Sequence, residues 1–198
     1  MNSKNEILKY YFGYDSLKEE QSEIIDSILA NNDTIGLLPT GYGKSICFNI
    51  PALLFDGITI VITPLISLMQ DQVRNLKDKF IKADYINSLQ TEAEKDNVYK
   101  KLLNDKIKIL FVAGERLLTK RFINVINKIN VSLVVCDEAH TLLWSEDFRQ
   151  SLKFIPDFID KLNKRPPILA LTATATKLTI AKITNILKLN SPRLIIGD

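Results

Sequence analysis

The sequence predicts an α/β domain in which a parallel, doubly wound sheet is flanked by helices. Strand-like apolar runs alternate with helix-like amphipathic segments along most of the 198 residues, which is the pattern of βαβ units. Several strand candidates are apolar throughout, as expected of strands that are covered on both faces. A glycine-rich turn at residues 39–45 follows the first strand, at the edge where such sheets collect their ligands.

The individual elements follow from hydrophobic periodicity and from turn residues. Strands are expected at residues 34–38, 58–63, 83–86, 107–113, 131–136, 168–172 and 193–196. Helices are expected at residues 18–30, 44–55, 65–80, 92–104, 120–128 and 177–187, with Thr176 as the N-cap of the last one. Residues 149–162 also have helical spacing, but Pro156 is expected to kink or divide that segment.

Composition indicates one ordinary domain with a real core. The chain is 46% hydrophobic and 25% charged, which is average for a globular protein, and its net charge of +3 permits a nucleic-acid partner without arguing for one. Residues 1–33 are expected to form N-terminal helices packed on a main nucleotide-binding domain at 34–198. Cys47 and Cys136 are interpreted as buried, reduced thiols. No apolar run approaches the length of a membrane span, so we expect a cytoplasmic protein without a membrane partner.

The turn after the first strand has the residue types that grip a nucleotide triphosphate. Gly41 and Gly43 let backbone N–H groups close around phosphates, Lys44 reaches the β and γ oxygens, and the Ser45 hydroxyl can bind Mg²⁺. The strict phosphate-loop pattern has an earlier glycine that is missing here. Taken alone, the segment is therefore also compatible with an ordinary glycine-rich turn before a helix.

Two carboxylates at the end of another buried strand make that alternative remote. Asp137 is the acidic partner for the metal, and Glu138 can orient or activate an attacking water molecule. The two segments together predict a site for ATP and Mg²⁺. In this site Lys44 and Glu138 are the catalytic residues, and Ser45 and Asp137 are the metal ligands.

The order and spacing of these motifs resemble the first, RecA-like motor domain of a superfamily 2 helicase. The segments are Pro-Thr-Gly-Tyr-Gly-Lys-Ser at 39–45, Asp-Glu-Ala-His at 137–140 and Thr-Ala-Thr at 172–174. Two more segments are similar to the RecQ-type DNA helicases. They are Phe-Gly-Tyr at 12–14 with Gln21, and Trp-x-x-Asp-Phe-Arg at 144–149. The resemblance extends from about residue 7 to residue 189.

This resemblance implies a role for each matching residue at the nucleotide. The nucleotide-binding set is Tyr14, Lys18, Gln21, Pro39, Thr40, Gly41, Tyr42, Gly43, Lys44 and Ser45. Tyr14 is expected to stack on adenine and Gln21 to bond its Hoogsteen edge, while Lys18 stands where the family has arginine. Tyr42 replaces a small residue and is expected to shield the loop partly. The alternative for Tyr14 is packing in the core.

Coupling and DNA contacts are also implied by the resemblance. His140, the single histidine, is expected to bond Thr172 or Thr174 and to relay the nucleotide state, although a lone histidine is more often structural. The implied DNA-binding residues are Thr63, Ser67, Arg116, Trp144, Phe148 and Arg149. The aromatic pair and the arginine at 144–149 suit base stacking beside a cation. Their alternative is a buried Trp–Phe pair that closes a helix.

The implied activity is that of an ATP-dependent DNA helicase acting on single strands and duplex junctions. Such an enzyme needs a second RecA-like domain, which supplies an arginine finger and which this chain lacks. We therefore expect the chain alone to be nearly inactive. The alternatives are a nucleotide-gated nucleic-acid-binding module without turnover and an RNA-directed helicase of the Asp-Glu-Ala-Asp or Asp-Glu-Ala-His class.

Overall fold

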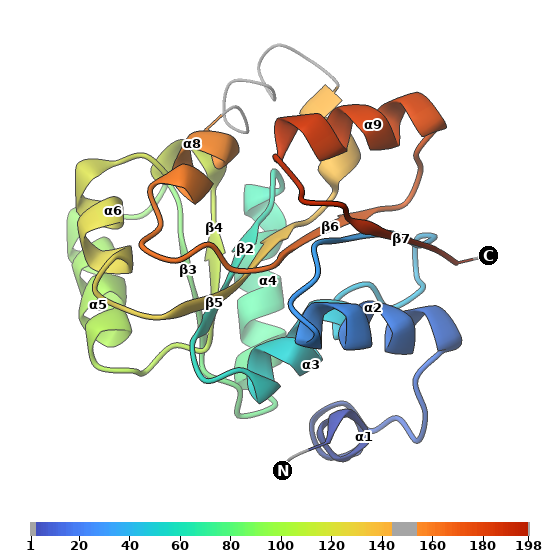
Figure 1. Ribbon diagram of the computed structural model, residues 1–198. Coiled ribbons are helices and arrows are strands. Elements are labelled where there is room, and N and C mark those ends of the chain that lie inside the picture. The colour runs from blue at the N-terminus through green and yellow to red at the C-terminus, as the bar shows by residue number, and fades with distance from the viewer. Residues whose placement is uncertain (1–2, 144–153, 198) are drawn as a thin grey trace.

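A parallel sheet forms the centre of the molecule (Figure 1). The structure, a computed structural model, describes residues 3–143 and 154–197. Within these residues the sheet has seven strands in the order β3-β4-β2-β5-β6-β1-β7, and every pairing is parallel. The strands are β1 Thr34–Leu37, β2 Ile58–Ile62, β3 Ala83–Ile86, β4 Ile109–Val112, β5 Val131–Cys136, β6 Ile168–Thr172 and β7 Arg193–Ile196. The predicted fold class is confirmed.

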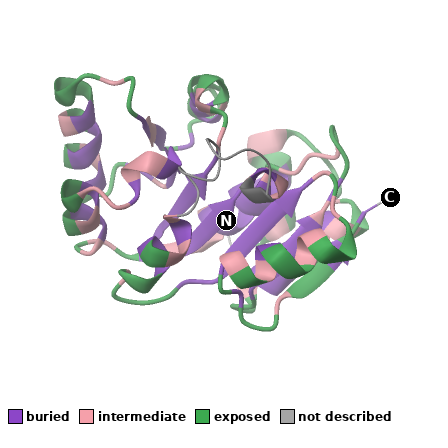
Figure 2. Cartoon of the chain, turned by 90° about the horizontal axis from the view of Figure 1, so that it is seen from above, coloured by how far each residue is buried: buried purple, intermediate pink, exposed green. Residues whose placement is uncertain are grey.

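Helices cover both faces of this sheet, as the division of the core shows. Val61 and Val135 pack in one hydrophobic cluster, whereas their chain neighbours Ile60 and Val134 pack in another, because successive side chains of a strand point to opposite faces. The first face is covered by α2 Glu19–Leu29, α3 Ile46–Leu54 and α4 Ile66–Lys77. The second is covered by α5 Glu92–Leu103, α6 Lys120–Ile126, α8 Ile155–Asp160 and α9 Lys177–Ile186. Figure 2 shows the strands buried and the outer sides of the helices exposed.

The N-terminal segment is part of this architecture. A short helix, α1 Lys4–Ile7, continues into one turn of π-helix, η1 Leu8–Phe12, which ends at Gly13 in the left-handed region at φ +73°. Ile7 and Leu8 pack against Ile25 of α2 and Ile50 of α3. Helix α2 also contributes to the main core through its opposite side, so the turn at its start is held firmly over the sheet.

Several helix boundaries differ from the predicted ones for local reasons. Helix α3 starts at Ile46, because Lys44 and Ser45 belong to the preceding turn, where the Ile46 N–H donates to the Gly43 carbonyl over 3.0 Å. Pro156, which is expected to kink or divide its segment, lies in the first turn of α8. The described helix begins beside it at Ile155, where no intrahelical hydrogen bond needs the missing N–H of proline. Residues 149–153 of that predicted helix lie outside the described residues. In the described part, no helix combines the length and apolarity needed to cross a bilayer.

A buried ion pair joins three strands at the edge of the sheet opposite to the ends of β1 and β5. The Asp33 carboxylate, whose side chain is 2% exposed, accepts from Arg165 Nη1 at 3.1 Å and Nη2 at 2.6 Å. It also accepts from the backbone N–H groups of Ile168 at 2.9 Å and Asn190 at 2.6 Å. The same aspartate therefore holds the starts of β1 and β6 and the approach to β7.

Candidate nucleotide-binding site

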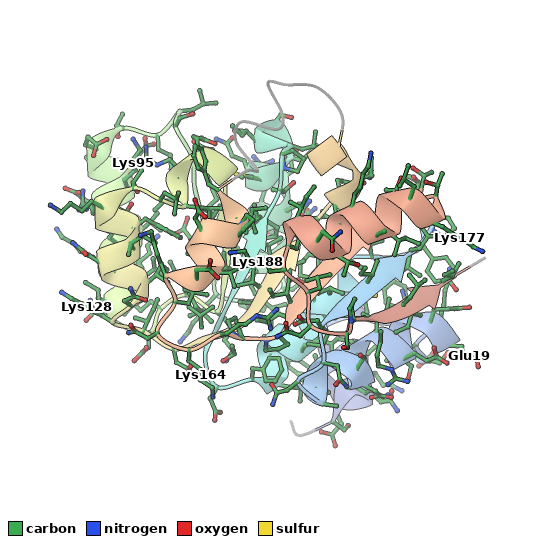
Figure 3. All side chains as sticks on the ribbon, turned by 45° about the horizontal axis from the view of Figure 1, so that its top comes forward. Glu19, Lys95, Lys128, Lys164, Lys177 and Lys188 are labelled. Carbon is green, nitrogen blue, oxygen red and sulfur yellow. The ribbon has the colours of Figure 1, made fainter. Side chains whose placement is uncertain are left out.

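A cavity of about 830 Å³ opens where β1 and β5 end. The turn at the start of α2, the loop after β1 and the two carboxylates after β5 all contribute to its wall. Predicted site residues that line it are Tyr14, Lys18, Gln21, Gly41, Tyr42, Gly43, Lys44, Ser45, Asp137 and Glu138. Figure 3 shows Glu19 of α2 and Lys177 of α9 on the same side of the molecule, which is the side of these loops. The topology thus gathers residues that are more than a hundred positions apart in the sequence.

The loop after β1 depends on two glycines. Gly41 has φ +79° and Gly43 has φ +86°, a region that side chains other than glycine rarely adopt. A Cβ added at Gly43 would also lie 2.7 Å from Gln21 Nε2, so the end of the Gln21 side chain would have to move. Pro39, Thr40 and Ser45 are exposed along the loop. The loop therefore presents its backbone and the Ser45 hydroxyl to solvent.

Lys44 and Glu138 form an ion pair across the cavity. Lys44 Nζ lies 3.2 Å from Glu138 Oε1, and the two side chains are 14% and 24% exposed. Glu138 has φ +51°, an uncommon value for a side-chain-bearing residue, which the turn after β5 imposes. Lys44, the expected phosphate-binding cation, and Glu138, the expected water-orienting carboxylate, thus neutralise each other in this structure.

The ionised form of the Asp137 carboxylate would be stabilised by a nearby cation. Burial, with a smaller contribution from the Glu138 charge, raises the pKa of Asp137 to about 6, although the Glu138 N–H and Lys44 act in the opposite direction. The Glu138 N–H donates to Asp137 Oδ1 over 3.0 Å, which orients the carboxylate. Among the described residues no cluster of three or more His, Cys, Asp or Glu could hold a metal ion. Asp137 and Ser45 nevertheless fit Mg²⁺, which takes hard oxygen ligands and often only one or two from the protein when phosphates bind it.

His140 connects the end of β5 to the end of β6. His140 Nδ1 lies 2.8 Å from Thr172 Oγ1 and 3.4 Å from Glu138 Oε2. The Thr172 hydroxyl donates its own proton to the Thr174 carbonyl over 3.1 Å, so the proton of the His140 bond is on Nδ1. Burial lowers the pKa of His140 below its ordinary 6.5, which keeps the ring neutral at pH 7. Of the two expected threonines, Thr172 supplies its side chain and Thr174 its carbonyl.

The expected base-binding residues are engaged with the loop. Gln21 is buried, and its Nε2 donates to the Tyr42 carbonyl over 2.9 Å while its Oε1 accepts from the Lys18 N–H over 3.0 Å. Lys18 Nζ lies 3.7 Å from the centroid of the Tyr42 ring. Tyr14 is 59% exposed at the cavity wall, so it is not a core residue.

One residue that contacts the loop has no signal in the sequence. Glu20, in the first turn of α2, accepts a hydrogen bond from the Tyr42 hydroxyl. Acidic residues are common in the first turn of a helix because they interact well with its dipole, and Glu20 looks like one of these in the sequence. Its partner lies far along the chain, where periodicity and motif spacing carry no information.

The expected DNA-binding residues have different environments. Thr63 is buried, and its hydroxyl accepts from the Leu65 N–H over 3.3 Å. Ser67 is exposed in the first turn of α4, and Arg116 is half-buried in a 3₁₀ turn, η2 Gly114–Arg116. Arg116 Nε is buried without a hydrogen-bond partner among the described residues. Trp144, Phe148 and Arg149 lie outside the described residues.

Comparison with known families identifies the class that this fold and site define. The family model for DEAD/DEAH box helicases matches residues 18–183, and the chain belongs to that family. Solved structures agree in fold. The chain is similar to the DUF1998 helicase MrfA bound to DNA, with a TM-score of 0.82 and 18% identity over 100% of this chain and 30% of that one. It is also similar to Mss116p bound to single-stranded RNA and AMP-PNP, with a TM-score of 0.79 and 21% identity over 99% and 42%.

Sequence relatives define the branch within this family. RecQ, an ATP-dependent DNA helicase of Pasteurella multocida, is 42% identical over 194 residues, which are 98% of this chain and 30% of the relative. RecQ of Bacillus subtilis is 45% identical over 175 residues, or 86% and 29%. The chain is thus a helicase domain of the RecQ type, as its motifs predict. It spans about 30% of the length of these relatives.

Proposed function

We propose that this domain binds ATP with Mg²⁺ and hydrolyses it as the first motor domain of a DNA helicase. The observation that carries the proposal is the convergence of Lys44, Asp137 and Glu138 on one cavity of about 830 Å³. The wall of the same cavity also includes Tyr14, an exposed ring suited to a base. A loop rich in backbone N–H groups, a cation and two carboxylates are what phosphoryl transfer to water requires from a protein.

Nucleotide binding would begin with an exchange of partners at Lys44. The triphosphate replaces Glu138 as the counterion of Lys44, whose present distance to Glu138 is 3.2 Å. Glu138 is thereby freed to accept a hydrogen bond from a water molecule and to orient it towards the terminal phosphate. The loop N–H groups between Gly41 and Ser45 hold the phosphate oxygens. Ser45 and Asp137 would hold Mg²⁺, which when bound offsets the negative charge of the phosphates.

The contact between His140 and Thr172 supports a route from DNA to hydrolysis. His140 Nδ1 faces both Thr172 Oγ1 and Glu138 Oε2, so a movement of the turn after β5 relative to Thr172 would change the partners of Glu138. In the proposed enzyme, DNA is held near Ser67, Arg116 and the segment at 144–149. A shift there is transmitted through His140 to the carboxylate that orients water.

A single substitution tests the nucleotide site. Lys44→Ala is expected to weaken ATP binding at least 100-fold, since hydrogen bonds to charged groups contribute about 1.5–3 kcal/mol each and Lys44 would make more than one. Titration calorimetry with Mg²⁺ and ATP measures this. Lys9→Ala is the matched control, because Lys9 is exposed, pairs with Asp15 and does not line the cavity. An unchanged ATP affinity in Lys44→Ala would contradict the proposal.

The preference of the domain for DNA or RNA is tested separately. Because the chain alone is expected to hydrolyse ATP very slowly, hydrolysis is followed under single-turnover conditions with the chain in excess over ATP. It is measured without nucleic acid, with single-stranded DNA and with RNA of the same sequence. We expect stimulation by DNA to exceed stimulation by RNA, because the relatives are DNA helicases. Greater stimulation by RNA would favour the RNA-directed alternative, and tight nucleotide-dependent DNA binding without any hydrolysis would favour the binding module.

A further inference from the structure

Tyr42 links the phosphate loop to the turn that starts α2. It is the one residue between Gly41 and Gly43, both of which have left-handed backbone conformations. Its hydroxyl donates to Glu20 Oε2, and its ring lies under Lys18 Nζ at 3.7 Å from the centroid. The side chain therefore reaches from the loop to the start of α2, where it contacts two charged groups.

The backbone of Tyr42 is tied to the same turn. Its carbonyl accepts from Gln21 Nε2 over 2.9 Å, and the other end of the Gln21 amide accepts from the Lys18 N–H over 3.0 Å. The bond from Tyr42, more than any other influence, holds the pKa of Glu20 below its usual value, so this carboxylate is ionised at neutral pH. Three residues at the start of α2, Lys18, Glu20 and Gln21, thus contact one residue of the loop.

Tyr42 also packs against the end of the sheet. A Cβ added at Gly197, directly after β7, would lie 3.2 Å from Tyr42 Cζ and 3.4 Å from its hydroxyl oxygen. The end of the ring therefore packs close to Gly197, where a larger residue would not fit unless its neighbours moved. The Glu20 carboxylate, the Lys18 ammonium group and the backbone at Gly197 together position the ring.

We propose that Tyr42 is a positioning residue that fixes the phosphate loop at a set separation from the base-binding turn. This inference rests on the proposed ATP site. ATP spans both parts, with its base at the turn near Tyr14 and its triphosphate in the loop. A ligand that must bridge two subsites binds more tightly when their separation is already correct, because the protein then loses less conformational freedom on binding. Tripolyphosphate occupies the loop alone and gains nothing from this arrangement.

The proposal predicts that breaking this contact lowers the affinity for ATP more than the affinity for tripolyphosphate. Tyr42→Phe removes the bond to Glu20 and keeps the ring, and it is expected to weaken ATP binding about fivefold, the scale of one hydrogen bond to a charged acceptor at a half-exposed position. Tripolyphosphate binding is expected to change less than about twofold, because the loop N–H groups and Lys44 remain. Both ligands are measured on the 198-residue chain, by calorimetry for ATP and by displacement of a fluorescent ATP analogue for tripolyphosphate.

A second variant and a control make the result specific. Glu20→Ala is expected to reproduce the effect of Tyr42→Phe, and the double variant is expected to be no weaker than either single one, since both remove the same bond. Glu20→Gln, which keeps an acceptor oxygen, is expected to restore most of the ATP affinity. Tyr10→Phe is the matched control, because Tyr10 is 69% exposed and does not line the cavity.

Each outcome separates the inference from the function on which it rests. If the unmodified chain fails to bind ATP, the proposed function falls and this inference with it. If the unmodified chain binds ATP and Tyr42→Phe weakens ATP and tripolyphosphate equally, Tyr42 merely supports the loop and the inference alone is wrong. Unchanged ATP affinity in Tyr42→Phe, or additive effects in the double variant, would overturn it as well.

Discussion

Replacing Asp33 by alanine is expected to destabilise the fold by about 3 kcal/mol. The change leaves the Ile168 N–H, at a fully buried residue, without its acceptor at 2.9 Å, which costs about 1–3 kcal/mol. It also leaves Arg165 without its bidentate partner, but the Arg165 side chain is 33% exposed and regains water. The sum lies at the lower end of the range for breaking a buried ion pair.

Equilibrium unfolding in urea, followed by far-ultraviolet circular dichroism, measures this difference directly. A loss of about 3 kcal/mol corresponds to a fall of roughly 6–12 °C in Tm for a chain of this size. Asp26→Ala is the matched control. Asp26 also pairs with a cation, Lys4, at 2.6 Å, but its side chain is 57% exposed and its loss is expected to cost less than about 1 kcal/mol.

The comparison of these two variants decides whether burial of the Asp33 carboxylate is the reason for the loss of stability. If Asp33→Ala and Asp26→Ala lie within about 1 kcal/mol of each other, then the buried network contributes no more than a surface pair, and the reasoning is refuted. Asp33→Asn adds a second check. Its amide group would turn a donor towards Arg165 or Asn190, so it is expected to be destabilised nearly as much as Asp33→Ala.

Two further predictions concern the site and the cysteines. In the full-length enzyme, Glu138→Gln is expected to retain ATP affinity within about threefold and to lose hydrolysis by about 10²–10⁴-fold, roughly the contribution of a general base. An equal loss of ATP binding would reassign Glu138 to the metal. Burial raises the pKa of both Cys47 and Cys136 from the ordinary 9.0 to about 12, so neither thiol is expected to react with a disulfide reagent at pH 7.5 until the chain unfolds. Because unfolded thiols lose their protons first, the unfolding free energy is expected to fall as pH rises from 9 to 12. In a variant with alanine at both positions, the unfolding free energy is expected to fall less steeply with pH. Equal slopes in the variant and the unmodified chain would contradict this account.

Much of the fold was predictable from sequence because its strands are buried on both faces. The bounds predicted for β5 Val131–Cys136 and β6 Ile168–Thr172 match the structure, since continuous apolar runs mark such strands clearly. The residues of the phosphate loop were also predictable, because their chemistry requires particular residue types at fixed spacing. The start of α3 was not, because Ser45 already has helical dihedral angles, φ −62° and ψ −29°, and its residue type does not show whether it belongs to the loop or to the helix.

The contacts that join distant segments could not be read from the sequence. Asp33 precedes a strand and has no pattern that points to Arg165, and Glu20 has none that points to Tyr42. The strand order is equally hidden, since periodicity identifies strands without saying which are neighbours. The structure thus adds the side-chain network that surrounds the predicted motifs.

The strand order has a consequence for the time at which the site forms. Strand β1, which carries the phosphate loop, pairs within the described sheet only with β6 and β7, in the registers Thr34↔Leu169 and Thr34↔Arg193. Pairing between segments so far apart in sequence is slow, because a long loop must close before any contact forms. The loop is therefore made early on the ribosome and fixed in place late. A growing chain that stops short of residue 168 contains every residue of the loop, and its strand still has no neighbour to pair with.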